Sequence, residues 1–240
     1  MDAKLRRKRA ELADLRDERD RLQQRRDERP AGKRARLNRL LERIRHRIDR
    51  LKVRIRKLER RSEDRKPNIV LRRLSPNYSE RSVPISLIVL HSTESDNIES
   101  SAADLAGVAA WFANPASQVS AHIITDADGT SARCVADKDK AWHCAAANSA
   151  SLGIEQIGHA SQDVWSSAQL DETARWIAKW CREHKIPCQH GAVLGSTVTR
   201  PGIVTHADLG ADGGGHTDPG SAYPVAAVIT QAKRLLGGSR

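Results

Sequence analysis

The stretch Ile85-Ser86-Leu87-Ile88-Val89-Leu90-His91 decides the fold. Its apolar residues follow one another without the alternation of a half-exposed strand, and the run is far too short to cross a membrane. Such a run predicts a strand that is buried on both faces, in a sheet with helices on either side. His91 follows directly, so its side chain is expected at the end of the strand, where open α/β sheets place ligands.

Strands and helices alternate on either side of this stretch. Further strands are expected at Ala121–Thr125, Thr130–Val135 and Ser151–Ile157, and helices at Ser101–Phe112, Asp171–His184 and Ala222–Leu236. This order indicates an α/β domain, a mixed central β-sheet flanked by helices, which we assign to residues 82–240.

The first 66 residues have a different pattern, in which leucine and isoleucine recur with spacings of 3, 4 or 7 residues. The strong series is Leu37, Leu41, Ile44, Ile48, Leu51, Ile55 and Leu58, and a weaker series is Leu5, Leu12, Leu15 and Leu22. Pro30-Ala31-Gly32 separates the two series and breaks a helix. We therefore predict two helices, about Asp2–Glu28 and Lys33–Glu63, folded back as an N-terminal α-helical coiled-coil hairpin over residues 1–66. A parallel oligomeric coil is the alternative. Residues 67–81 are expected to be a linker.

Charge divides the chain in the same place. Of the 240 residues, 1–66 hold 27 Lys and Arg against 13 Asp and Glu, a net charge of +14, whereas the remainder carries −3. Two interpretations stay open: a solvated hairpin that spaces or oligomerises the chain, or an anchor for anionic wall polymers or an anionic membrane. Nucleic acid is not expected as a partner, because residues 1–66 contain no aromatic residue for base stacking.

Candidate metal ligands are spread over distant segments. His91 ends the buried strand, His206 lies in Thr205-His206-Ala207-Asp208, and Asp218 follows a glycine-rich loop. Two imidazoles and a carboxylate are a sufficient protein shell for catalytic zinc, with water in the fourth position. Glu155 ends another apolar strand, where a general base would be useful.

Five motifs then resemble, in family order, the type-2 N-acetylmuramoyl-L-alanine amidases, a superfamily with phage endolysin amidases, bacterial muropeptide amidases and animal peptidoglycan recognition proteins. The motifs are Ile88-Val89-Leu90-His91-Ser92-Thr93, Val119-Ser120-Ala121-His122, Ala141-Trp142-His143, Ser151-Leu152-Gly153-Ile154-Glu155, and His206 with Thr217-Asp218-Pro219-Gly220. The resemblance covers residues 82–237 and excludes residues 1–66.

The resemblance implies one zinc ion per chain, held by His91, His206 and Asp218, with Glu155 as the catalytic acid and base. His216 stands where a Lys is common in bacterial relatives, which implies a role in stabilising the oxyanion. Trp142 and His143 match positions that line the substrate cleft. His122 matches a position that is usually structural.

The implied activity is hydrolysis of the amide between N-acetylmuramic acid and L-alanine in bacterial peptidoglycan. Met1–Arg29 lacks the apolar stretch of a secretory signal, so we expect synthesis in a host cytoplasm and action on the wall after the membrane is permeabilised. This favours a phage endolysin. A muropeptide-recycling amidase and a non-catalytic peptidoglycan-binding module are the alternatives. Cys134, Cys144, Cys181 and Cys188 are expected as reduced thiols, with a Cys181–Cys188 or Cys134–Cys144 bridge left open.

Overall fold

The computed structural model describes residues 3–63, 66–95, 102–195 and 197–237. The chain divides into two compact units, Met1–Asp64 and Arg65–Arg240. No described helix is both long enough and apolar enough to cross a membrane.

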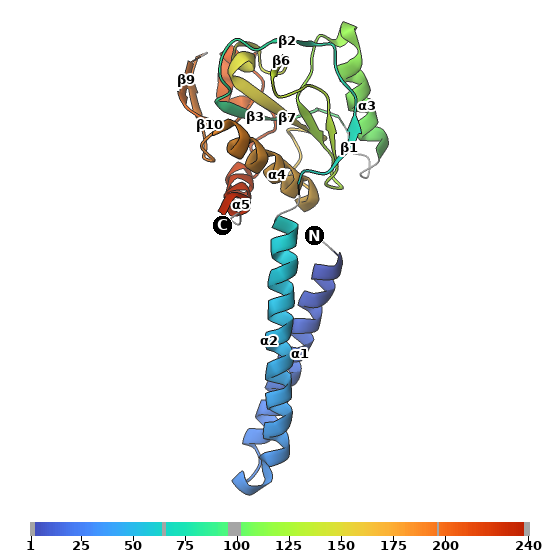
Figure 1. Ribbon diagram of the computed structural model, residues 1–240, viewed down its shortest axis with the longest axis vertical. Coiled ribbons are helices and arrows are strands. Elements are labelled where there is room, and N and C mark those ends of the chain that lie inside the picture. Colours follow the sequence, from blue (N-terminus) through green and yellow to red (C-terminus); the bar gives the residue numbers. More distant parts are fainter. Residues whose placement is uncertain (1–2, 64–65, 96–101, 196, 238–240) are drawn as a thin grey trace. The chain divides into compact units, whose positions relative to one another are not determined.

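The first unit is a helical hairpin (Figure 1). Helix α1 (Ala3–Asp27) and helix α2 (Ala35–Glu63) are joined by a short turn that contains the 3₁₀ helix η1 (Ala31–Lys33). The guanidinium of Arg34 closes the turn by donating to the carbonyls of Arg29 (2.6 Å) and Asp27 (3.3 Å). An ion pair of 2.7 Å between Arg9 and Glu59 joins the start of α1 to the end of α2, as an antiparallel arrangement requires.

Both predicted apolar series form the core of this hairpin. The buried members are Leu5, Leu15, Leu22, Leu37, Leu41, Ile44, Ile48, Leu51 and Ile55, with Leu12 and Leu58 packed against them. Because these side chains bury one another, the outer surface of the hairpin is left to charged residues.

The second unit is built on a six-stranded sheet with the strand order β1-β5-β4-β7-β3-β10. Its strands are β1 (Ile69–Arg72), β5 (Ser131–Arg133), β4 (Ile123–Thr125), β7 (Ser151–Gln156), β3 (Leu87–Ser92) and β10 (Gly202–Thr205). The β4–β5 pair is antiparallel and the other pairs are parallel, so the predicted mixed sheet is confirmed. Two small antiparallel ribbons join β2 (Tyr78–Glu80) to β6 (Asp139–Ala141), and β8 (Ala192–Leu194) to β9 (Thr197–Arg200).

Helices cover both faces of the sheet. Helices α4 (Ser167–His184) and α5 (Val225–Gly237) lie on one face (Figure 1). Their residues, such as Trp176, Trp180 and Val228, share a core cluster with Ile88 and Leu90 of β3. Helix α3 (Ala102–Ala113) packs on Ile124 and Ala132 in a separate cluster. The short 3₁₀ helices are η2 (Pro115–Ser117), η3 (Ala145–Ala150) and η4 (Ala207–Gly213). The central strand β3 is wholly buried, as its uninterrupted apolar run predicts.

The segment expected as a linker, residues 67–81, belongs instead to the second unit. It contributes β1 to the edge of the main sheet and β2 to a ribbon. Two of its polar residues are buried: the amide of Asn77 donates to the carbonyls of Asn114 (2.9 Å) and Val119 (3.1 Å), and Ser75 donates to the carbonyl of Phe112. Ser and Asn resemble a linker by composition, but here their hydrogen bonds fix the chain to the domain.

The four cysteines are free thiols, so neither of the two bridges left open by the sequence is present.

Candidate active site

A cavity of about 680 Å³ opens on the face of the sheet opposite to α4 and α5. His91 alternates with Leu90 along β3, so it projects to the side away from those helices. The described lining includes each of the candidate residues, namely His91, Trp142, His143, Glu155, His206, His216 and Asp218. Residues that are up to 127 positions apart in the chain thus share one cavity.

The structure brings His91, His206 and Asp218 together at the end of the central strands. Nδ1 of His91 lies 3.1 Å from Nδ1 of His206, and each lies beside a carboxylate oxygen of Asp218, at 3.2 Å and 2.9 Å. All three side chains are buried, and one ligand atom from each lies within 4.8 Å of the others. The backbone amide of Ser92 donates to Asp218 Oδ2 (3.3 Å) and orients the carboxylate.

A chain of hydrogen bonds fixes the tautomer of His91. The hydroxyl of Ser151 donates to the carbonyl of Ala147 (2.8 Å), so it accepts from Nε2 of His143 (3.2 Å). Nδ1 of His143 then accepts from Nε2 of His91 (2.9 Å). His91 therefore keeps its proton on Nε2 and turns the lone pair of Nδ1 toward Asp218.

A hydrogen bond also fixes the tautomer of the second imidazole, His206. Nε2 of His206 donates to the carbonyl of Gly213 (2.7 Å), so Nδ1 is the ring nitrogen that faces Asp218. Burial lowers the pKa of His91 to about 4, so this ring is neutral at pH 7. Two nitrogen lone pairs and a carboxylate that converge in this way can hold a cation, and two His with one Asp form a shell that suits zinc.

Glu155 adds a second carboxyl group, which differs from that of Asp218 in its hydrogen bonding and its pKa. It lies opposite His91 in the parallel β3–β7 pair, and its Oε2 is buried with no hydrogen-bond partner among the described residues. Burial, followed by the charges of Asp218 and Glu94, raises its pKa to about 8. A carboxyl group with such a pKa takes up and releases a proton near neutral pH.

His216 and Trp142 lie at the wall of the cavity. The exposed ring of His216 stacks on His206 with a centroid separation of 4.5 Å and an interplanar angle of 16°. Trp142 is half-buried, and its indole nitrogen donates to Ser79 Oγ (2.8 Å). Both side chains therefore border the space in front of the candidate ligands.

His143 and His122 lie behind the candidate ligands. The ring of His143 lines the cavity but is bonded to His91 and Ser151, an arrangement that orients a ligand. His122 is fully buried and bonded to the amide of Gly153 (2.9 Å) and the carbonyl of Asp139 (3.1 Å), as a structural residue would be.

Sequence reasoning missed several residues of the site. Gly153 is required by the ring of His143, because a Cβ built there would lie 2.7 Å from Nδ1 of that ring. Trp111 on α3 is 56% exposed and borders the same cavity. The glycine within a strand was the available signal for a close approach, whereas nothing in the pattern of α3 separates Trp111 from a core residue.

A second group of possible metal-binding side chains is Asp137, Glu183 and His184. Arg133 (2.5 Å) and Lys179 (3.8 Å) already neutralise Asp137. We interpret this group as an ion-pair cluster.

The profile of the N-acetylmuramoyl-L-alanine amidase family matches residues 81–221. N-acetylmuramoyl-L-alanine amidase A of Achromobacter lyticus is 34% identical over 116 residues, which are 48% of this chain and 61% of that relative. The match thus spans about three-fifths of the length of the relative.

Solved structures show the same fold in the second unit. Hydrolase AmiA of Staphylococcus aureus, solved with its ligand, has a TM-score of 0.56 at 15% identity, over 72% of this chain and 87% of that one. A selenomethionine derivative of AmpD has a TM-score of 0.50 at 22% identity, over 69% and 93%. The family profile covers more than half of the chain and contains the motifs that carry the resemblance. The chain belongs to the N-acetylmuramoyl-L-alanine amidase family.

Proposed function

We propose that this protein is a zinc-dependent peptidoglycan hydrolase that cleaves the amide between N-acetylmuramic acid and L-alanine. The observation that carries the proposal is the convergence of His91, His206 and Asp218 beside Glu155, whose Oε2 is buried and has no hydrogen-bond partner among the described residues. The family profile and the amidase from Achromobacter lyticus support the same reaction.

His91 and His206 would hold the ion through their Nδ1 atoms, and Asp218 through its carboxylate. Zinc bound there supplies a Lewis acid that polarises the scissile carbonyl and lowers the pKa of water toward ~7. His143 and the carbonyl of Gly213 keep the two imidazoles in the tautomer that binds a cation.

Glu155 is the proton carrier in this proposal. Its carboxylate takes a proton from the attacking water and then delivers that proton to the nitrogen of the departing L-alanine. The raised pKa supports both the uptake and the delivery of the proton, because at neutral pH the group neither holds the proton too tightly nor loses it too readily. His216, at the cavity wall, would donate a hydrogen bond to the oxyanion that forms on the carbonyl.

Two aromatic side chains would hold the substrate. Trp142 and Trp111 border the cavity on different elements and offer flat apolar surfaces for a sugar ring or the stem peptide.

For the biological setting, we propose a phage endolysin that degrades the host wall. The hairpin is a compact unit of its own and suits a separate attachment role in such an enzyme. The alternatives are an amidase that recycles soluble muropeptides and a binding module without activity.

The experiment is digestion of purified walls and of soluble muropeptides, with new amino termini identified by mass spectrometry. An endolysin clears walls and exposes L-alanine termini. A recycling amidase exposes them only on soluble fragments. If neither substrate gains L-alanine termini, the amidase proposal is wrong.

A further inference from the structure

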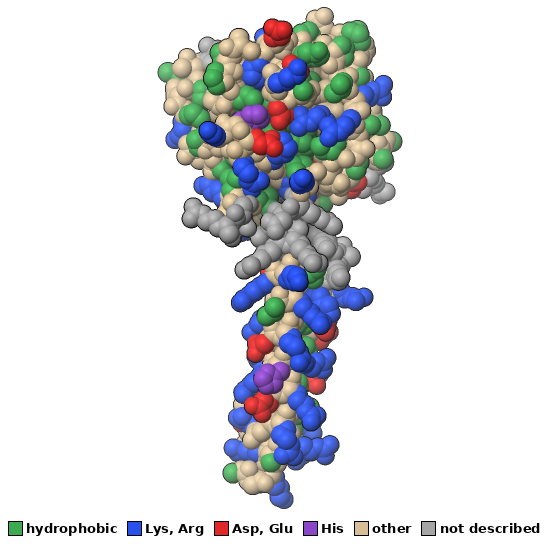
Figure 2. Space-filling model, in the orientation of Figure 1, with side chains coloured by type: hydrophobic (Ala, Val, Ile, Leu, Met, Phe, Trp, Pro, Cys, Tyr) green, Lys and Arg blue, Asp and Glu red, His purple; other side chains and the backbone are tan. Residues whose placement is uncertain are grey.

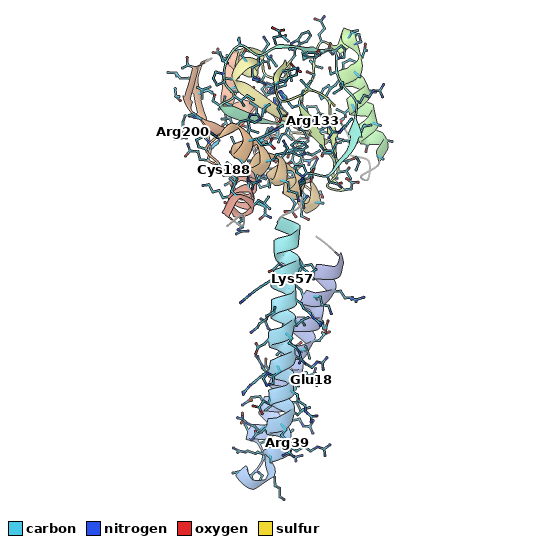
Figure 3. The ribbon with its side chains drawn as sticks, in the orientation of Figure 1. Glu18, Arg39, Lys57, Arg133, Cys188 and Arg200 are labelled. Carbon is cyan, nitrogen blue, oxygen red and sulfur yellow. The ribbon has the colours of Figure 1, made fainter. Side chains whose placement is uncertain are left out.

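The outer surface of helix α2 carries a continuous cationic stripe. With 100° per residue, one 80° sector of the helix between positions 36 and 57 holds only cations, spaced by 3 or 4 residues. They are Arg36, Arg39, Arg43, Arg47, Arg50, Arg54 and Lys57. All seven side chains are exposed, and Arg39 and Lys57 are labelled toward its two ends in Figure 3. At about 1.5 Å per residue the stripe is about 32 Å long.

The opposite side of the same helix is built differently. There, Arg45, Lys52 and Arg56 share the surface with Glu42 and Asp49, and Lys52 lies 3.7 Å from Asp49. Acids thus compensate the cations on one face of α2 but not on the other. Figure 2 shows how strongly Lys and Arg predominate over Asp and Glu on the visible face of the hairpin.

The positive charge of the stripe is only weakly neutralised by the acidic side chains nearby. Among the described residues, the ion pairs of the hairpin use side chains outside the stripe, such as Arg9 with Glu59. Glu11 of α1 is within electrostatic reach, but its pKa is lowered first by a hydrogen bond from Lys8 and only further by Arg47 and Arg54. Like charges three and four residues apart destabilise a helix, so the stripe costs stability unless an anion neutralises it.

We propose that this stripe binds a linear phosphodiester polymer of the bacterial cell wall. Six of its seven members are Arg, whose guanidinium donates two parallel hydrogen bonds to a phosphate. A row of regularly spaced cations suits a chain with repeating phosphates. The choice of a wall polymer rests on the proposed function, because the substrate of the enzyme lies in the wall.

An anionic membrane fits the hairpin less well. Helices that lie in a membrane interface bury a broad apolar face, whereas the apolar face of α2 is already packed on α1. The large apolar side chains that the described hairpin exposes on α2 are Leu40 and Val53, which are 13 positions apart and on different sides of the helix.

Two variants of the full chain with equal charge change test the stripe. The stripe variant combines Arg47→Gln, Arg50→Gln and Arg54→Gln. The matched control combines Arg45→Gln, Lys52→Gln and Arg56→Gln on the opposite face of the same turns. Binding to soluble poly(glycerol phosphate), and to walls before and after chemical removal of their phosphodiester polymers, is measured from about 50 mM to about 200 mM salt.

We expect the stripe variant to lose about tenfold or more in affinity and to show a shallower salt dependence, while the control keeps most of its binding. Stripped walls should retain less wild-type protein. Equal loss in both variants, or no loss in either, would overturn the proposal. Equal or tighter binding to phosphatidylglycerol vesicles or duplex DNA would overturn the assignment to a wall polymer.

Two further readouts separate this inference from its alternatives. Without polymer, the stripe variant should be at least as helical by circular dichroism as the wild type, because like-charge repulsion is relieved. Lower helicity would show that the stripe stabilises the hairpin itself and would contradict the proposal. Hydrolysis of soluble muropeptides should be unchanged in both variants, so a failure of the proposed enzymatic function appears separately from a failure of polymer binding.

Discussion

His91 on β3 and Glu155 on β7 lie directly opposite each other in a parallel strand pair and project from the same face of the sheet. The candidate metal ligand and the candidate proton carrier are therefore positioned by backbone register. A shift of either strand by one residue would turn one of the two side chains to the other face. The remaining candidate ligands are His206, at the end of β10, and Asp218, in a loop that is bonded back to β3 through Ser92.

Replacing Glu155 with Gln should strongly slow hydrolysis without loss of metal. Gln has nearly the same shape but cannot accept and pass on a proton, so we expect kcat to fall by about 10² to 10⁴. The measurement is muropeptide hydrolysis together with metal content. Glu94→Gln removes another carboxyl group from the same cavity wall and is expected to remain active. An active Glu155→Gln protein would assign the proton transfer to another group.

Gly153→Ala should weaken metal binding by displacing His143. The new methyl group would lie 2.7 Å from Nδ1 of the His143 ring, which orients His91. We expect a loss of metal affinity of about 10-fold to 100-fold and a loss of unfolding free energy of about 1–3 kcal/mol. Chelator competition and denaturant unfolding measure the two effects.

The matched control is Gly107→Ala on α3, where a Cβ meets no atom within 4 Å. It should stabilise the helix by up to about 1 kcal/mol and leave metal affinity unchanged. If both variants bind metal like the wild type, His143 does not orient the ligand as inferred.

The stability of the metal-free protein should depend on pH through Glu155. Its pKa is raised from 4.5 to about 8 by burial, so the folded state holds a proton that the unfolded state has released. Stability from this group is full below about pH 4.5 and falls by about 1.4 kcal/mol per unit as the pH rises toward 8.

Glu155→Gln removes this dependence. In chelator, the variant should match the wild type near pH 4.5 and exceed it in unfolding free energy at pH 8. Comparing the two proteins cancels the titration of the nearby histidines. Parallel stability curves for the two proteins across this range would show that Glu155 is not buried in its neutral form.

Trp111→Ala should raise KM with little change in kcat, because the side chain borders the cavity without touching the reacting groups. Loss of one aromatic contact predicts an increase of about 5-fold to 10-fold. Val164→Ala is the control, since Val164 is 81% exposed and does not line the cavity. Equal KM values for the wild type and Trp111→Ala would exclude a substrate contact.

The elements that the sequence predicted well are those with an unambiguous apolar period. The run before His91 predicted β3, and the paired apolar series predicted α1 and α2. Helix α4 begins four residues before the predicted start because Ser166 caps it by accepting from the amide of Ala168 (3.3 Å). The strands that were missed, such as β1 and β10, are only four residues long and lie at the sheet edges, where pairing rather than local pattern defines a strand.

Only the part of the site that residue type and sequence motif identify could be predicted from the sequence. Histidine, aspartate and glutamate carry a recognisable chemistry, so His91, His206, Asp218 and Glu155 could be proposed from motifs. The contact between Ser151 and His143 could not, because it depends on where η3 folds against β7. A serine or glycine of this kind has no chemical signature outside its three-dimensional contacts.

The central claim is that His91, His206 and Asp218 hold zinc, and metal content measures it most directly. Wild-type protein, Asp218→Ala and the surface control Asp212→Ala would be purified identically and analysed by mass spectrometry for metals. The account predicts one zinc per chain in the wild type and in Asp212→Ala, and essentially none in Asp218→Ala. Equal zinc in all three proteins, or none in the wild type after zinc is supplied, would contradict it.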